Sequence, residues 1–230
     1  MEERPMMEVR HLTLVSGSRV LARDISFRAH PGECLLLAGP NGCGKTTLLR
    51  SLAGLGDPPP EGSICPDGEV VFVPTGIPKV KGFTVEAFIR TGCYRFSNWA
   101  GRLDASSRRR LEDALDLLGL GACRGRDLST LSDGEFQRAC IAVGLARRAN
   151  ILLLDEPTAF LDVENRQMVL RCLAELIGRT GMGVIFSSHD LHDALAVARR
   201  VLAFTPGGFR ESTEENRLEV LQEAFPGLRL

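Results

Sequence analysis

The sequence predicts an α/β protein with a mostly parallel sheet core, an N-terminal antiparallel β lobe and an inserted α-helical lobe. Three observations predict this fold class. Continuous apolar runs at 34–38, 151–154 and 183–187 have the composition of buried strands. Segments with helical composition separate these runs, as in a sheet covered on both faces. A glycine-rich loop follows the first run and opens a helix.

Composition bounds the class of protein. The chain has 230 residues and 44% hydrophobic content, which suits one domain with a buried core and excludes disorder. Its net charge of -1 provides no positive field for nucleic acid, so we expect no nucleic-acid partner. Apolar runs such as 140–146 are far shorter than the roughly 18–20 residues that cross a bilayer. Residues 1–10 lack the apolar region of a secretory signal, so we expect the chain to stay in the cytosol.

Cysteine usage excludes two further classes. The chain has seven cysteines, an odd number, and none of them forms a CxxC pair. This pattern indicates neither a disulfide framework nor a zinc site.

A hairpin and a later strand predict the antiparallel lobe. Two short runs, 9–14 and 24–28, flank the turn signal Ser16-Gly17-Ser18. A further short strand at 70–73 ends at Pro74. The lobe is expected over residues 8–31 and 61–74.

The sheet core and the helical lobe follow from the remaining periodicity. Leu111, Ala114, Leu115 and Leu118 recur at helical spacing, and Ser132 is a plausible N-cap of a helix over 135–147. Further helices are expected at 46–52, 164–177 and 191–199. The predicted divisions are 32–56 and 149–205 for the core, 80–147 for the helical lobe, and 206–230 for a C-terminal peripheral segment.

The glycine-rich loop carries the first chemical motif. It fits GxxxxGK followed by Ser or Thr, the phosphate-binding P-loop, and it stands in the required strand and helix context. Backbone amides would surround phosphate oxygens, Lys45 would reach the β- and γ-phosphates, and the Thr46 hydroxyl would bind Mg²⁺. The alternative is a chance glycine turn before a helix. The predicted nucleotide-binding residues are Gly39, Pro40, Asn41, Gly42, Cys43, Gly44, Lys45, Thr46 and Thr47.

Two adjacent acids form the second motif. Asp155 and Glu156 follow the apolar run 151–154, at the strand edge where α/β sheets bind ligands. Asp155 would hold the coordination shell of Mg²⁺ in place, and Glu156 would act as general base on the attacking water. The alternative is a pair of acids at a helix N-terminus. Their position 110 residues after Lys45, in a chain that already has a P-loop, favours the catalytic interpretation.

Further motifs carry a family resemblance. Leu131-Ser132-Asp133-Gly134-Glu135 resembles the LSGGQ signature of the ATP-binding cassette (ABC) ATPases. Pro157-Thr158-Ala159-Phe160-Leu161-Asp162 resembles their D-loop, and Ser187-Ser188-His189-Asp190 resembles their switch-histidine segment. The resemblance runs from about residue 9 to residue 205.

The resemblance implies a P-loop NTPase that uses ATP and Mg²⁺ and pairs head to tail with a second copy of itself. The signature residues Ser132, Asp133, Gly134 and Glu135 would meet the γ-phosphate held by the partner. His189 would hydrogen-bond the γ-phosphate and the attacking water, completing the catalytic set of Glu156, His189 and Lys45. Asp162 would connect the two sites across the dimer.

Three departures from the family pattern predict altered contacts. By spacing, Val15 stands where the family has an aromatic that stacks on adenine, which predicts weak base contacts and relaxed purine selectivity. Thr75 replaces the Q-loop glutamine. Asp133 and Glu135 add negative charge to the signature, which favours the helix dipole and opposes nucleotide.

Length indicates which kind of cassette this is. Only 87 residues separate Lys45 from Ser132, too few for the coiled-coil insertion of chromosome and DNA-repair cassettes, and one cassette argues against the translation-factor type. The segment 83–103 resembles the helical lobe of ATPases that power uptake of iron chelates, haem and cobalamin. The resemblance therefore implies an importer ATPase, peripheral on the cytoplasmic face of the inner membrane, with integral membrane permease partners.

Some alternatives stay open. The aromatic cluster Phe83, Phe88, Tyr94, Phe96 and Trp99 suits either a groove for a permease helix or ordinary lobe packing. A soluble ABC ATPase of iron–sulfur cluster assembly and a nucleotide-binding regulatory module with weak hydrolysis are the rival functions.

Overall fold

The computed structural model describes residues 4–96 and 102–227, which divide into two compact units. The sheet unit contains the described residues up to 75, together with 150–157 and those from 177 onward. The helical unit contains residues 76–149 and 158–176. The mixed α/β class with a mostly parallel sheet, an antiparallel β subdomain and an inserted helical lobe is confirmed.

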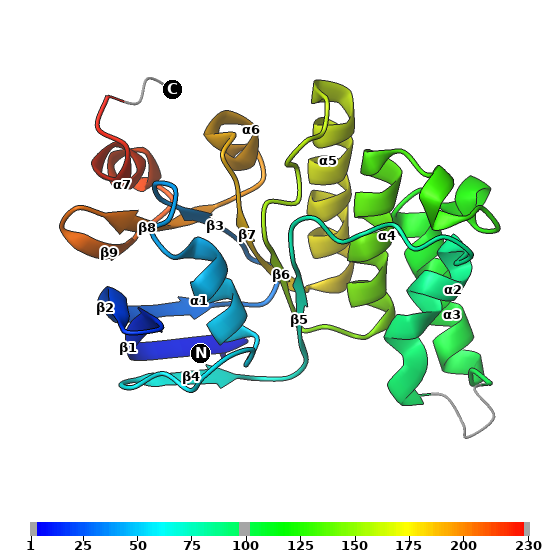
Figure 1. Cartoon of the computed structure of the whole chain (residues 1–230), viewed down its shortest axis with the longest axis horizontal. Coiled ribbons are helices and arrows are strands. Elements are labelled where there is room, and N and C mark those ends of the chain that lie inside the picture. The colour runs from blue at the N-terminus through cyan, green and yellow to red at the C-terminus, as the bar shows by residue number, and fades with distance from the viewer. Residues whose placement is uncertain (1–3, 97–101, 228–230) are drawn as a thin grey trace. The chain divides into compact units, whose positions relative to one another are not determined.

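Six strands form the larger sheet of the sheet unit, in the order β5, β6, β7, β3, β8, β9 (Figure 1). All neighbours are parallel except β8 and β9. Every residue of β3, β6 and β7 is buried, which explains their continuous apolar sequences. The strands are β3 (Cys34–Ala38), β5 (Val70–Val73), β6 (Ile151–Leu154), β7 (Gly183–Ser187), β8 (Arg200–Thr205) and β9 (Gly208–Glu211).

A three-stranded antiparallel sheet has the order β2, β1, β4. Gly17, with φ of 57°, occupies the turn between β1 and β2, where glycine adopts the left-handed conformation without strain. The strands are β1 (Met7–Ser16), β2 (Arg19–Ala29) and β4 (Ser63–Pro66).

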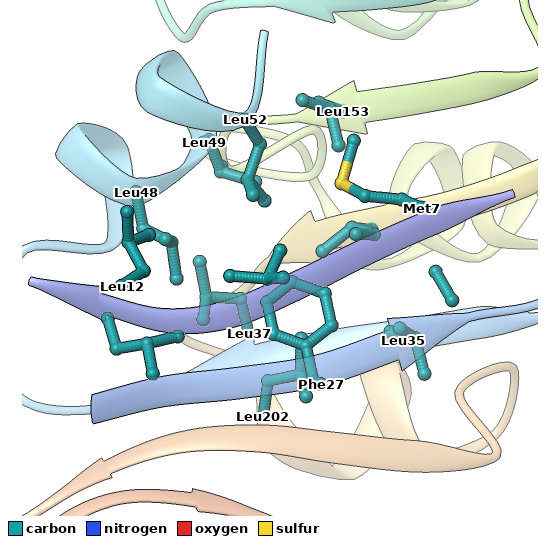
Figure 2. Packing of buried hydrophobic residues seen from close by; sticks show 14 of the residues in the cluster. Met7, Leu12, Phe27, Leu35, Leu37, Leu48, Leu49, Leu52, Leu153 and Leu202 are labelled. Atoms are coloured by element: carbon teal, nitrogen blue, oxygen red, sulfur yellow. The ribbon is translucent and has the colours of Figure 1, made fainter. Parts of the chain in front are cut away.

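The core of the sheet unit joins both sheets through helix α1 (Lys45–Leu52). Leu48, Leu49 and Leu52 of α1 pack with Leu12 of β1 and Leu37 of β3, all fully or almost fully buried (Figure 2). Burying a leucine side chain contributes about 1.5–3 kcal/mol, so this cluster fixes the helix that opens at the glycine-rich loop. Two shorter helices, α6 (Leu191–Leu195) and α7 (Arg217–Ala224), complete the unit.

The helical unit is built around α4, which contacts α2 and α3. The 3₁₀ segment Thr91–Phe96 passes so close to α4 that a Cβ on Gly92 would lie 2.4 Å from the carbonyl oxygen of Val143. Within residues 4–96 and 102–227, no helix combines the length and apolar content that a membrane span requires. The helices are α2 (Val85–Arg90), α3 (Ala105–Leu117), α4 (Asp133–Ala146) and α5 (Val163–Thr180), whose last turn belongs to the sheet unit.

The structure corrects several predicted boundaries. Residues 70–73 do not belong to the antiparallel lobe, because β5 pairs in parallel with β6. The helix predicted at 191–199 ends at Leu195. Part of the expected peripheral segment 206–230 pairs with the sheet as β9 before α7 begins.

The predicted aromatic cluster divides into packed and exposed members. Phe88 stacks on Phe136 with ring centroids 5.9 Å apart, so it belongs to the packing of the helical unit. Phe83 and Tyr94 are exposed, and Trp99 lies outside the described residues.

Candidate ATP-binding site

The glycine-rich loop joins β3 to α1 in a backbone conformation that its glycines permit. Gly39 has φ of 148° and Gly44 has φ of 119°. A Cβ on Gly44 would lie 2.9 Å from Cδ1 of Leu21, so the loop and strand β2 are in close contact. The N-cap residue of α1 is Gly44, which has no side chain to cap the helix, and this leaves the helix N-terminus suited to an anion.

Lys45 carries the positive charge of this loop. Its side chain is almost fully buried, and Nζ donates hydrogen bonds to the carbonyl oxygens of Gly39 at 2.8 Å and Pro40 at 3.2 Å. The lysine stem is therefore held across the loop. A cation and a helix N-terminus at one loop create a favourable position for a polyphosphate.

The carboxyl edge of β6 places a network of oxygen atoms beside this loop. Asp155 accepts a hydrogen bond from the Thr46 hydroxyl at 2.8 Å and one from the Ser187 hydroxyl at 2.9 Å. The Thr75 hydroxyl donates to the Asp155 carbonyl oxygen at 2.5 Å. Both oxygens of the Asp155 side chain are thus fixed in position, one of them against Thr46.

Glu156 has a left-handed backbone conformation, with φ of 50°. This conformation is costly for a residue with a side chain, and it is held by the backbone amide of Glu156, which donates to the Ser187 hydroxyl at 2.9 Å. Nε2 of His189 lies 2.6 Å from Oε1 of Glu156. The two side chains are therefore within hydrogen-bond distance of each other.

A pocket of about 490 Å³ contains this pair. Glu156, His189, Lys45 and Thr46 all line it. Gly39, Pro40 and Cys43 do not line it, although they belong to the predicted nucleotide-binding set. Pro40 and Cys43 instead face a neighbouring pocket of about 390 Å³. The other lining residues of the larger pocket are Ser16, Arg19, Leu21, Asn41, Gly42, Gly44 and Thr47.

The signature residues lie in the helical unit, at the start of α4. The Ser132 hydroxyl accepts a hydrogen bond from the Glu135 amide at 3.1 Å, and the Glu135 carboxylate accepts one from the Ser132 amide at 2.7 Å. This reciprocal capping box fixes the first turn of the helix. The Ser132 hydroxyl therefore keeps its own proton for an external acceptor.

The two acids of the signature each have a cationic partner. Nζ of Lys79 lies 2.6 Å from Asp133 and also donates to the carbonyl oxygen of Leu131 at 2.8 Å. Nη1 of Arg126 lies 2.8 Å from Glu135. The negative charge predicted to oppose a nucleotide at this helix is consequently compensated by Lys79 and Arg126.

Gly134 brings the signature and the D-loop together within the helical unit. A Cβ at this position would lie 2.4 Å from Oδ1 of Asn165. Asn165 is in turn bound to Asp162, through its backbone amide at 2.8 Å and its side-chain amide at 3.0 Å. The glycine is required because Asn165 occupies the space of a side chain.

Comparison with known proteins agrees with this set of motifs. The ABC transporter family model matches residues 22–159, which is more than half of the chain. The chain is an ABC transporter ATPase.

Two relatives and one solved structure illustrate the similarity of this ATPase to import systems. The petrobactin import ATP-binding protein FpuD of Bacillus anthracis is 32% identical over 210 residues, covering 86% of this chain and 77% of that protein. The aliphatic sulfonates import ATP-binding protein SsuB 2 of Burkholderia cenocepacia strain HI2424 is 34% identical over 219 residues, covering 91% and 77%. A metal-chelate type ABC transporter in an inward-facing conformation superimposes with a TM-score of 0.88 at 28% identity, covering 97% of this chain and 90% of that one.

Sequence reasoning missed several residues of the candidate site. Ser16, Arg19 and Leu21 line the pocket, whereas Val15, the position assigned to the base by spacing, does not. Ser187 was recognised only as part of a motif, and its link between Asp155 and the Glu156 amide was not predicted. The signal in the sequence for these hairpin residues is the turn Ser16-Gly17-Ser18. Ser16 pairs with Arg19 across this turn, so both residues lie at one end of the hairpin.

The capping box of this ATPase predicts a pH-dependent stability. Burial opposes ionisation of Glu135, but hydrogen bonds from the Ser132 amide, Cys123 and Arg126 outweigh it and lower its pKa from 4.5 to about 2. A lowered carboxyl pKa stabilises the folded state above pH 4.5, and this contribution disappears as the pH falls through about 2. We expect Glu135→Gln to reduce the free energy of unfolding at pH 7 by about 1–2 kcal/mol, after allowance for partial exposure.

Urea unfolding between pH 7 and pH 3 checks this prediction. The difference between the variant and the wild type should shrink steadily below pH 4.5. Glu112→Gln is the control, because Glu112 is half-exposed and pairs with Arg124 on the surface. A deficit in Glu135→Gln that stays constant with pH would contradict the role of the ionised carboxylate.

Proposed function

We propose that this ATPase is the ATP-binding and ATP-hydrolysing subunit of an ABC importer for a metal chelate, such as an iron-siderophore, haem or cobalamin. The observation that carries hydrolysis is the Glu156 and His189 pair in one pocket with Lys45 and Thr46. The observation that favours import is the similarity to import ATPases and to a metal-chelate type transporter.

ATP would bind with its phosphates on the glycine-rich loop. The amides at the start of α1 and the Lys45 ammonium would neutralise the β- and γ-phosphates. The glycines of this loop have positive φ, a conformation in which successive backbone amides can converge on an anion. Asn41, Gly42, Gly44 and Thr47 would complete the contacts from the wall of the pocket.

The residues around Thr46 fit Mg²⁺. Its hydroxyl and the Asp155 carboxylate are two hard oxygen donors whose atoms lie 2.8 Å apart. Mg²⁺ in nucleotide sites takes few protein ligands, with phosphate and water oxygens supplying the rest. The ion, when bound, neutralises charge on the β- and γ-phosphate oxygens.

Glu156 would accept the proton of the attacking water. The water oxygen bonds to the γ-phosphorus, the bond from that phosphorus to the β,γ-bridging oxygen breaks, and ADP and inorganic phosphate leave. Ser187 keeps the Glu156 backbone in its strained conformation, and so directs the carboxylate into the pocket. His189, bound to Glu156 through Nε2, would transfer this hydrogen bond to a γ-phosphate oxygen.

A second copy of the chain would complete the site. Ser132 retains a hydroxyl proton for a partner's γ-phosphate, and Lys79 removes the charge penalty of Asp133. Beside Asp162, the side chains of Phe160 and Val163 are 91% and 61% exposed. Such an apolar pair is a candidate for burial by another subunit. Head-to-tail closure and opening of this dimer would drive integral membrane permease subunits, with the ATPase on the cytoplasmic face of the membrane.

Uptake in cells of the source organism tests the cargo. Lys45→Ala in the native gene should abolish uptake of one labelled metal chelate among ferric siderophore, haem and cobalamin. Uptake of a labelled aliphatic sulfonate should not change, and Lys81→Ala, an exposed lysine outside the site, is the matched control. Loss of sulfonate uptake with every chelate unaffected would overturn the cargo class. A sulfonate import protein is the natural comparison, because its sequence identity to this chain, 34%, is close to that of the petrobactin import protein, 32%.

A further inference from the structure

The hairpin of β1 and β2 lies beside the glycine-rich loop. Ser16 and Arg19 pair across the end of this hairpin. Leu21, two residues after Arg19, lies so close to the loop that a Cβ on Gly44 would be 2.9 Å from Cδ1 of Leu21. The hairpin is therefore held in place beside the pocket.

Arg19 stands between the two pockets of this region. It lines both the pocket of about 490 Å³ that holds Glu156 and the neighbouring pocket of about 390 Å³. Leu21 and Gly42 also line both. These pockets share a wall, and Arg19 is the charged member of that wall.

The guanidinium of Arg19 differs from those of the other arginines on strand β2 in its contacts. Arg28 on the same strand donates to Glu8 at 2.9 Å, and Arg23 lies 4.0 Å from Glu61. Over residues 4–96 and 102–227, by contrast, no hydrogen bond or ion pair engages the Arg19 side chain, which is exposed. Its planar face is free to receive a ligand.

The two ends of the larger pocket suit different parts of a nucleotide. Lys45, Thr46 and the start of α1 form the phosphate end. Ser16, Arg19 and Leu21 form the hairpin end. Of the described residues that line the pocket, none has an aromatic ring other than the His189 imidazole paired with Glu156. For a base whose phosphates bind to the loop, the Arg19 guanidinium is the planar group that can stack on it.

We propose that Arg19 is the base-binding residue of this ATPase, its guanidinium stacking on the face of the purine above Leu21. Arginine stacks on π-systems through its planar delocalised cation. Stacking of this kind tolerates different bases because every base has a π-face. Arg19 thus supplies affinity without selecting adenine over guanine. The inference rests on the proposed nucleotide function and adds its base contact.

Binding measurements on the purified chain with three ligands test this role. Arg19→Ala should weaken ATP and GTP binding equally, by about threefold to tenfold, the range of a partly exposed cation–π contact. Tripolyphosphate, which has no base, should bind the variant and the wild type alike. Arg19→Lys, which keeps the charge but loses the planar stacking surface, should recover only part of the affinity that Arg19→Ala loses. Arg23→Ala, an exposed arginine of the same strand, should bind all three ligands normally.

Each other outcome has a distinct meaning. Unchanged ATP affinity in Arg19→Ala would overturn the base contact. An equal loss for tripolyphosphate and ATP would overturn it also, because Arg19 would then be a phosphate ligand. A wild-type chain that binds no ATP at all would instead contradict the proposed function, so the two failures are distinguishable.

Discussion

Glu156→Gln is expected to reduce steady-state phosphate release by at least about 100-fold while ATP binding persists. The amide cannot accept the proton of the attacking water, and a positioned general base contributes about 10²–10⁴-fold. The substitution keeps the shape of the side chain, so a contact with His189 remains. ATP would consequently stay intact between two protomers, and an ATP-bound dimer should accumulate.

Phosphate release and sedimentation, both with excess ATP and magnesium, check the two parts of this prediction. Glu164→Gln is the matched control, since Glu164 is an exposed glutamate at the start of α5 outside the pocket. Hydrolysis at the wild-type rate in Glu156→Gln would remove Glu156 from the role of general base. A variant that remains monomeric would count against the head-to-tail dimer.

Lys45→Ala is expected to weaken ATP binding by about 100-fold. Hydrogen bonds to charged groups contribute about 1.5–3 kcal/mol each, and Lys45 would contact two phosphates. Among the described residues that line the pocket, Arg19 is the one other lysine or arginine, so the phosphate charge would lose its main partner. Calorimetric titration of ATP into the purified variant measures this loss.

Folding must be separated from binding here, because Lys45 is almost fully buried and holds two carbonyl oxygens of the loop. Lys45→Met retains the apolar stem and gives a second measurement, and circular dichroism reports the fold of each variant. Lys81→Ala is the control for loss of a lysine. Wild-type ATP affinity in a folded Lys45→Met would contradict the P-loop assignment.

The parts of the fold that local pattern determines could be predicted from the sequence. The strand, glycine loop and helix from β3 to α1 were predicted because a fully buried strand is continuously apolar and glycine loops have a strict spacing. The sheet to which β5 belongs could not be predicted. Val70–Val73 has the composition of a strand in either sheet, and its pairing with β6 depends on residues about 80 positions away.

In the site, too, some residues follow from local motifs and others do not. Lys45, Thr46, Asp155 and Glu156 follow from motifs, and the structure brings them to one loop and one strand edge. The hairpin contacts do not follow from motifs. β1 and β2 have register shifts on both sides of Leu14, and the spacing of the family pattern selected Val15, whereas its neighbour Ser16 lines the pocket.

The contact between Gly134 and Asn165 has a consequence for the order of events in the proposed dimer. Asn165 fills the space beside Gly134 and holds Asp162, so the start of α4 cannot shift without displacing the D-loop. Tightly packed groups of this kind have discrete arrangements. The signature and the D-loop of one protomer would therefore engage the opposite nucleotide together, in an all-or-none step, and a half-engaged protomer would be too rare to accumulate.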